Sequence, residues 1–221
     1  MPELKDIYIR ILNYMEENLQ DDPVFDWIMR ETVTRGVPEI QITSEQGRFL
    51  RLMVTLTRAR RILEIGTLAG YSTVWMAQAL PADGKIITLE ANEKHAALAR
   101  DSFVQAGVAD KVEVLVGPAM DTLSRLELDE SLDLTFIDAD KPNNINYFRW
   151  AAAHSKPGAL IIIDNVFLNG RAIEPDAGEY MRSVDAFNKF IYSQHNYQTT
   201  VLPFFKKEED NLDAVMVVRL P

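Results

Sequence analysis

Residues 132–164 read LDLTFIDADKPNNINYFRWAAAHSKPGALIIID and decide the fold class. The short apolar runs at 132–138 and 159–164 are typical of buried strands, and the segment at 144–158 between them has a helical pattern. Parallel strands need a long crossover connection, usually a helix. The stretch therefore predicts two neighbouring parallel strands joined by a helix.

The same alternation continues towards the N-terminus. Apolar runs at 61–65, 85–90 and 111–116 are separated by helical stretches at 71–80 and 93–107. Repeated strand and helix segments are typical of a mostly parallel sheet with helices on both faces. We therefore expect a doubly wound α/β fold.

Two further strands are expected after a long helix at about 178–195. The runs at 199–205 and 213–220 are joined by a charged loop that is short enough for a hairpin. Strands joined in this way are antiparallel. The last strand is therefore predicted to run against the others.

The first 58 residues have a helical pattern, and Thr43 and Gln46 have the spacing of a capping box at a helix start. The chain contains no repeat, low-complexity segment or linker. We expect a single domain over 1–221, with an N-terminal helical part at 1–58 and an α/β core at 59–221.

The composition excludes several classes of function. The chain has 221 residues, 47% of them hydrophobic, and a net charge of −10, which disfavours nucleic acid as a partner. It has no cysteine, and its three histidines are scattered, so a zinc centre is not expected. The N-terminal segment lacks the apolar block of a signal peptide, and no later run reaches membrane length. A cytoplasmic protein without membrane attachment is predicted.

A glycine turn follows the first predicted strand, where open α/β sheets bind their ligands. Glu64 is followed by Gly66 and Gly70, and a helix begins directly after them. This G-x-x-x-G spacing differs from the G-x-G-x-x-G of nicotinamide dehydrogenases. Glu90 ends the second strand, 24 residues after Gly66, where an acid can accept both hydroxyls of a ribose. Together these features suggest a nucleoside cofactor without a pyrophosphate, which S-adenosylmethionine fits. The alternative is a plain turn and a solvated loop acid.

Acidic and amide side chains follow the fourth and fifth strands. Asp138 ends the fourth strand, and Asp164 and Asn165 end the fifth. Adjacent strands lie about 4.8 Å apart, so these side chains can converge on one ion. Carboxylate and amide oxygens suit Mg²⁺, Mn²⁺ or Ca²⁺. The alternative is that the two acids cap the helices that follow them.

Three segments resemble a known family. LEIGTLAGYSTVWMA at 63–77, FIDADK at 136–141 and IIIDNV at 161–166 resemble the metal-dependent, catechol-type and caffeoyl-coenzyme-A-type O-methyltransferases. The resemblance covers about residues 40–220 and implies a seven-stranded, Rossmann-like class I methyltransferase sheet. It also implies a small phenolic acceptor, such as a catechol, caffeate or a flavonoid, and a homodimer in which the N-terminal helices close over the acceptor.

The resemblance also implies roles for single residues. Asp138, Asp164 and Asn165 would hold the divalent metal, and Lys141 would be the catalytic base beside the acceptor hydroxyl. Asp138 would contribute to catalysis and to the cofactor site as well. The cofactor site would comprise Ile42, Glu64, Gly66, Thr67, Ser72, Glu90, Ala119 and Asp138, with Glu90 on the ribose. The alternative for Lys141 is a surface lysine.

Two positions depart from the family pattern. Pro118 stands where many members have an acid for the adenine amine, so adenine would rely on backbone and apolar contacts. The segment at 203–212 is longer than the usual turn before the last strand, with Asn211 in place of glycine, and Asn tolerates a left-handed turn.

Two other functions stay open at this point. One is a non-catalytic module that binds a nucleoside or mediates dimerisation. The other is a nicotinamide-dependent oxidoreductase, which the glycine spacing disfavours. The absence of a tyrosine and lysine pair at helical spacing that could be assigned to hydride chemistry also disfavours it.

Overall fold

The computed structural model describes residues 4–206 and 211–221. It contains a seven-stranded sheet with the order β3-β2-β1-β4-β5-β7-β6. The strands are β1 (Arg61–Ile65), β2 (Lys85–Glu90), β3 (Val112–Val116), β4 (Leu132–Ile137), β5 (Ser155–Ile163), β6 (Gln198–Lys206) and β7 (Asn211–Arg219). Strands β1 to β5 are parallel to one another, whereas β7 is antiparallel to both β5 and β6. The predicted α/β fold class and the antiparallel last strand are confirmed.

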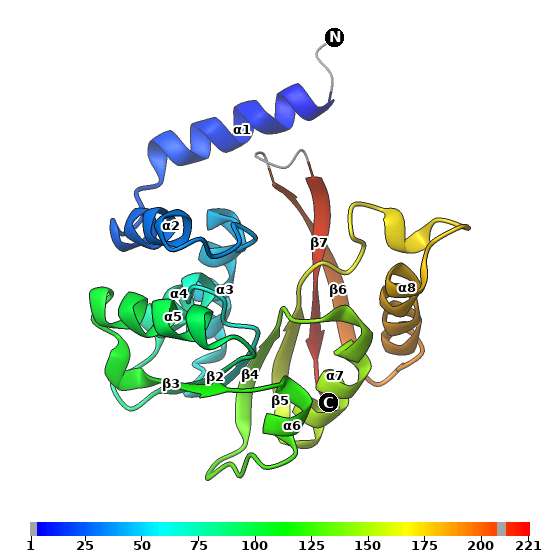
Figure 1. The fold of residues 1–221 in the computed structure, drawn as a ribbon. Helices are drawn as coiled ribbons and strands as arrows, with labels where there is room; N and C mark the ends of the chain where they lie inside the picture. Colours follow the sequence, from blue (N-terminus) through cyan, green and yellow to red (C-terminus); the bar gives the residue numbers. More distant parts are fainter. Residues whose placement is uncertain (1–3, 207–210) are drawn as a thin grey trace.

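Helices lie on both sides of this sheet (Figure 1). They are α1 (Leu4–Asn18), α2 (Val24–Thr34), α3 (Ser44–Thr57), α4 (Tyr71–Ala79), α5 (Glu93–Gln105), α6 (Ala119–Leu123), α7 (Asn144–Ala153) and α8 (Glu179–Tyr192). Three short 3-10 helices are η1 (Ala109–Lys111), η2 (Lys141–Asn143) and η3 (Arg171–Ile173). The predicted capping box is present, because Thr43 and Gln46 bond each other's backbone at the start of α3.

Two predicted boundaries are wrong. The segment 144–158 was expected to be helical, but α7 ends at Ala153 and strand β5 already begins at Ser155. The reason is that the Pro157-Gly158 pair cannot continue a helix. The long loop expected at 203–212 is mostly strand, since β6 extends to Lys206 and pairs there with Asn211 of β7. Asn211 is therefore a strand residue and not a turn residue. Residues 207–210 of this predicted loop lie outside the described residues.

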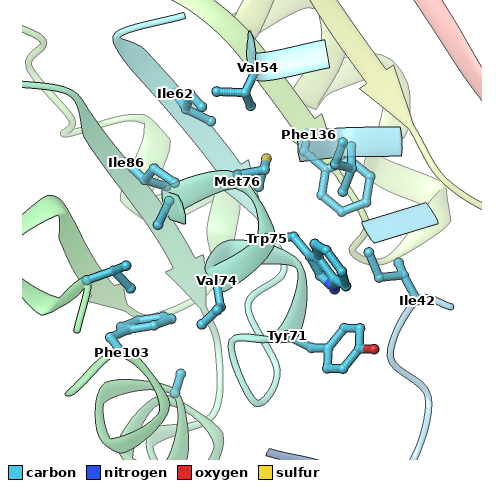
Figure 2. Packing of buried hydrophobic residues seen from close by; sticks show 14 of the residues in the cluster. Ile42, Val54, Ile62, Tyr71, Val74, Trp75, Met76, Ile86, Phe103 and Phe136 are labelled. Carbon is cyan, nitrogen blue, oxygen red and sulfur yellow. The ribbon is translucent and has the colours of Figure 1, made fainter. Parts of the chain in front are cut away.

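Each face of the sheet has its own hydrophobic core. Ile62 packs with α2 to α5, whereas its neighbour Leu63 packs with α6 to α8 on the other face. On the first face, the Trp75 ring stacks on Phe25 with the ring centroids 3.9 Å apart. Figure 2 shows Trp75 beside Ile42, the residue that precedes the α3 cap. The two cores hold the strand ends in fixed positions.

None of the helices found in residues 4–206 and 211–221 is long and apolar enough to cross a lipid bilayer.

Candidate active site

The strand order reverses between β1 and β4, and the tips of three central strands are tied together there. The Asp138 amide donates to the Ile65 carbonyl at 2.9 Å, and the Asp164 amide donates to the Ile137 carbonyl at 3.0 Å. The pairing of β1 with β4 and of β4 with β5 thus continues one residue beyond the ends of β4 and β5. Ligands of open α/β sheets bind at such a point.

Gly66 lies directly against the backbone at the tip of β4. Its φ is +102°, and a Cβ built on it would lie 2.1 Å from the Asp138 carbonyl oxygen. Only a residue without a side chain can approach so closely. The glycine turn therefore has a packing reason in addition to its conformation.

Glu64 lies fully buried beneath the turn. Its carboxylate accepts hydrogen bonds from the hydroxyls of Ser72, Thr73 and Thr88. Burial raises the pKa of Glu64 to about 7, although these hydrogen bonds oppose the rise. Glu64 thus supports the start of α4 from below, and it does not line the cavity described next.

A cavity of about 670 Å³ lies above the strand ends. The other residues expected at the cofactor site, together with Lys141 and Asn165, lie on its wall: Ile42, Gly66, Thr67, Ser72, Glu90, Ala119 and Asp138. Pro118 and Met120 flank Ala119 on the same wall, which is apolar at the position where an acid is absent. The cavity is large enough for a nucleoside cofactor.

Glu90 is held in place on the wall of this cavity. It is only 8% exposed, and it accepts hydrogen bonds from the Leu68 amide at 2.8 Å and the Asn92 amide at 3.0 Å. His95, which the sequence did not single out, lies 3.4 Å from the same carboxylate. A solvated loop acid is therefore the wrong description. A carboxylate has lone pairs left for two further donors, such as ribose hydroxyls.

A second cavity of about 330 Å³ adjoins the first. Asp164 and Gln46 lie on its wall, and Asn165 borders both cavities. The backbone of Asn165 is left-handed, with φ 56°, which Asn adopts more readily than most residues. The ends of β4 and β5 therefore lie between a larger and a smaller compartment.

Lys141 is buried on the wall of the larger cavity, between the ends of β4 and β5. It is 5% exposed, and its Nζ donates to Asp138 Oδ1 at 3.0 Å and to the Asp164 carbonyl at 3.2 Å. Burial by itself lowers the pKa of the ammonium, but the charges of Asp138 and Asp164 outweigh this effect, so the pKa lies above its usual value. The surface-lysine alternative is wrong.

Asp138 and Asp164 do not cap the helices that follow them. Those N-cap positions belong to Asp140 for η2, Asn143 for α7 and Gly170 for η3. Burial, and next the charge of Asp138, raise the pKa of Asp164 to about 8. The negative charge of Asp138 therefore disfavours the ionised form of Asp164, and a positive charge beside the two would favour it.

The donor set fits a hard divalent cation. Within the described residues, no group of three or more His, Cys, Asp or Glu side chains could hold a metal ion. Asp138 and Asp164 supply two carboxylates, and Asn165 could add an amide oxygen from the same edge of the sheet. Oxygen-only sites of this kind are completed by water or substrate oxygens.

Sequence patterns missed two supporting contacts. The Gln46 amide donates to Asp164 Oδ1 at 2.8 Å, although the sequence identified Gln46 only as part of a helix cap. Asp213 accepts hydrogen bonds from the Phe167 and Ala214 amides and so ties the loop after β5 to β7. Both contacts join segments that are far apart in the chain, so no local spacing could reveal them.

Comparison with known proteins agrees with this architecture. The O-methyltransferase family profile matches residues 15–206. The chain is 40% identical over 187 residues to a catechol O-methyltransferase of Niastella koreensis, which covers 83% of this chain and 85% of that protein. It is 33% identical over 192 residues to a caffeoyl-CoA O-methyltransferase of Eucalyptus gunnii, which covers 78% and 77%.

A solved structure gives the same result for the fold and the cofactor. The O-methyltransferase from Bacillus cereus in complex with SAH, the demethylated cofactor, superposes with a TM-score of 0.92 at 34% identity, over 99% of this chain and all of that one. A non-catalytic module and a nicotinamide-dependent oxidoreductase do not agree with these relatives. The chain belongs to the O-methyltransferase family and is an S-adenosylmethionine-dependent enzyme.

Proposed function

We propose that the enzyme methylates one hydroxyl of a small catechol-type phenol and that it requires a divalent cation. The observation that carries this proposal is the buried junction of two cavities, where Lys141 contacts Asp138 and the Asp164 backbone. One compartment has the size and the acid for a nucleoside cofactor, and the other can take the acceptor. The two reactants would then meet at the ends of β4 and β5.

The cofactor site is proposed to lie along the larger cavity. Glu90 would accept the ribose hydroxyls, and Gly66, Thr67 and Ser72 would surround the methionine end. Ile42 and Ala119 would contact the cofactor through their backbone, and the wall at Pro118 would receive adenine by apolar contact. Bound S-adenosylmethionine supplies the electrophilic methyl group.

Asp138, Asp164 and Asn165 are proposed to hold Mg²⁺, with Mn²⁺ or Ca²⁺ as alternatives. The cation supplies positive charge that favours the ionised form of a phenol, whose pKa is otherwise about 10. Holding two adjacent hydroxyls in one orientation can contribute as much as about 7 to 11 kcal/mol through positioning. An acceptor with vicinal hydroxyls uses this arrangement best.

Lys141 is proposed to accept the proton of the acceptor hydroxyl. The carboxylates of Asp138 and Asp164 now raise its pKa. A cation held by these carboxylates would offset that attraction, so the buried ammonium could release its proton to solvent and the neutral Nζ could then act as a base. Asp138 would therefore influence catalysis through Lys141 as well as through its metal contact.

The smaller cavity supports a single-ring acceptor. Its volume of about 330 Å³ suits one aromatic ring with a short tail, not the nucleotide part of a coenzyme A thioester. Ile40, Met181 and Phe204 give it apolar walls. Among its described lining residues, Arg171 is the only basic one and Asp164 and Asp213 are acidic, so the charge of the wall favours neither neutral catechol nor caffeate within the catechol class.

A panel of acceptors tests this proposal. Catechol, caffeate, caffeoyl-CoA and a flavonoid are incubated with S-adenosylmethionine and Mg²⁺, with phenol and guaiacol as controls that lack two free vicinal hydroxyls. We expect singly methylated products from catechol and caffeate, less product from the bulkier flavonoid and caffeoyl-CoA, and little from the controls. Equal methylation of phenol and catechol, or no methylation of any vicinal diol, would contradict the proposed acceptor class.

The N-terminal helices are proposed to close over the acceptor and to contribute to a homodimer. Helix α1 lies outside the two cores and above α2 (Figure 1), and its Tyr8 ring lies 5.5 Å from the Phe205 ring of β6, measured between centroids. Ile11 and Tyr14 of α1 are 51% and 67% exposed. Such an apolar surface needs a partner, so a single monomer species in sedimentation at micromolar concentration would contradict the dimer.

The cytoplasmic location and the single domain also stay predictions.

A further inference from the structure

The side-chain amide of Gln46 makes two hydrogen bonds that point in different directions. Its Oε1 accepts from the Thr43 amide at 2.9 Å, and its Nε2 donates to Asp164 Oδ1 at 2.8 Å. Both side chains are buried, with exposures of 7% for Gln46 and 3% for Asp164. The sequence separates them by 118 residues. One amide thus connects the start of α3 to the end of β5.

We propose that Gln46 is a positioning residue that holds the Asp164 carboxylate in the orientation in which it binds the divalent cation. This inference rests on the metal site of the proposed function. Gln46 donates to one oxygen of the carboxylate, Oδ1, and so fixes the direction in which the group faces. Among the described residues it is the only side chain that donates to this carboxylate, because the Lys141 ammonium bonds the Asp164 backbone carbonyl instead.

The backbone that carries Gln46 cannot easily shift. The Thr43 hydroxyl accepts from the Gln46 amide nitrogen at 3.2 Å, which completes the capping box. The next residue, Gly47, lies against the Trp75 indole so closely that a Cβ there would be 2.2 Å from Nε1. Trp75 belongs to the buried cluster of Figure 2. A side chain on a fixed backbone transmits that position to its partner.

Gln46 also joins the two compartments. Ile42, next to the cap residue Thr43, lies on the wall of both cavities. The Oε1 contact holds this segment, while the Nε2 contact holds the carboxylate at the border of the smaller cavity. Partners that orient a metal ligand in this way commonly contribute about 10- to 100-fold to metal affinity.

The test is a titration of the enzyme with Mn²⁺, in which free Mn²⁺ is followed by electron paramagnetic resonance. Gln46→Met removes both amide contacts at similar length and without charge. Gln46→Asn keeps an amide but is one methylene too short to span the 2.8 Å contact. Thr43→Ala is the matched control, because it removes the hydroxyl that caps α3 and leaves the Gln46 contact with Asp164 in place. Binding of SAH in EDTA verifies that each variant is folded.

We expect both Gln46 variants to raise the Mn²⁺ Kd by about 10- to 100-fold, whereas Thr43→Ala lowers the Tm and leaves the Mn²⁺ Kd within about twofold of wild type. An unchanged Kd in a folded Gln46 variant, or an equal loss in Thr43→Ala, would overturn the inference, because Gln46 would then act only through the helix cap. If the wild-type enzyme binds no Mn²⁺, the proposed metal site itself fails, which is a different result.

Discussion

A side-chain carbon at Gly66 would lie 2.1 Å from the carbonyl oxygen of Asp138. The Gly66 turn, which is proposed to surround the cofactor, therefore lies directly against the end of β4, which is proposed to hold the metal. No side chain fits between them, so the two proposed sites share one backbone contact.

Gly66→Ala should therefore disturb both sites. The new methyl group would force apart the tips of β1 and β4. In addition, the φ of +102° at residue 66 is unfavourable for alanine. We expect a loss of unfolding free energy of about 3 kcal/mol or more, as is typical of severe steric mutations, with weaker SAH binding in calorimetry.

Gly107→Ala is the matched control, because Gly107 also has a positive φ, of 67°, but meets nothing within 4 Å. Its cost should be about 1 kcal/mol. Equal effects of the two substitutions would mean that the contact with Asp138 does not matter.

Glu90→Gln should weaken cofactor binding more than it slows the chemical step. The amide replaces a charged acceptor of the proposed ribose hydroxyls, far from the reacting methyl group. Losing charge-assisted hydrogen bonds costs about 1.5 to 3 kcal/mol, which is about 10- to 100-fold in the SAH Kd. Glu93→Gln, at an exposed acid that pairs with Arg100, serves as control and should bind SAH normally. An unchanged Kd in Glu90→Gln would exclude β2 as the ribose site.

Glu64→Gln should change how stability depends on pH. Folding raises the pKa of Glu64 from 4.5 to about 7. The protonated group therefore stabilises the folded state fully below pH 4.5, and this contribution to the free energy of unfolding is lost as the pH rises through 7. The loss amounts to about 3 kcal/mol. Urea unfolding of the cofactor-free protein should therefore show the variant gaining about 3 kcal/mol relative to wild type between pH 4.5 and 8. If the unfolding free energies of wild type and Glu64→Gln change in parallel with pH, the raised pKa of Glu64 is contradicted.

Lys141→Ala should leave cofactor binding intact and lower kcat by about 10² to 10⁴, the usual contribution of a positioned base. Raising the pH should restore part of the rate by ionising the acceptor in solution. Lys156→Ala, at a half-exposed lysine that pairs with Asp133, is the matched control and should keep its kcat. Wild-type kcat for Lys141→Ala from pH 6 to 9 at saturating substrate would show that Lys141 is not the base.

The order of strands and helices could be predicted because each of the first five strands contains a short apolar run and is followed by a helical stretch. The strand ends could be predicted as well, since Asp138, Asp164 and Glu90 each follow such a run. The Gln46 contact with Asp164 and the His95 contact with Glu90 could not, because they depend on how the elements pack. The start of β5 was misplaced because its first residues, Ser155 to Gly158, carry no apolar pattern.

The central claim is that methyl transfer depends on a divalent cation at the ends of β4 and β5. It is tested most directly by measuring the rate of catechol or caffeate methylation by metal-stripped enzyme in EDTA, before and after Mg²⁺ or Mn²⁺ is added in excess. SAH binding, measured in the same EDTA buffer, verifies that the stripped enzyme is intact. We predict that turnover is abolished by the chelator and restored by the cation. Full turnover in excess EDTA, with no metal detected on the protein, would contradict the account.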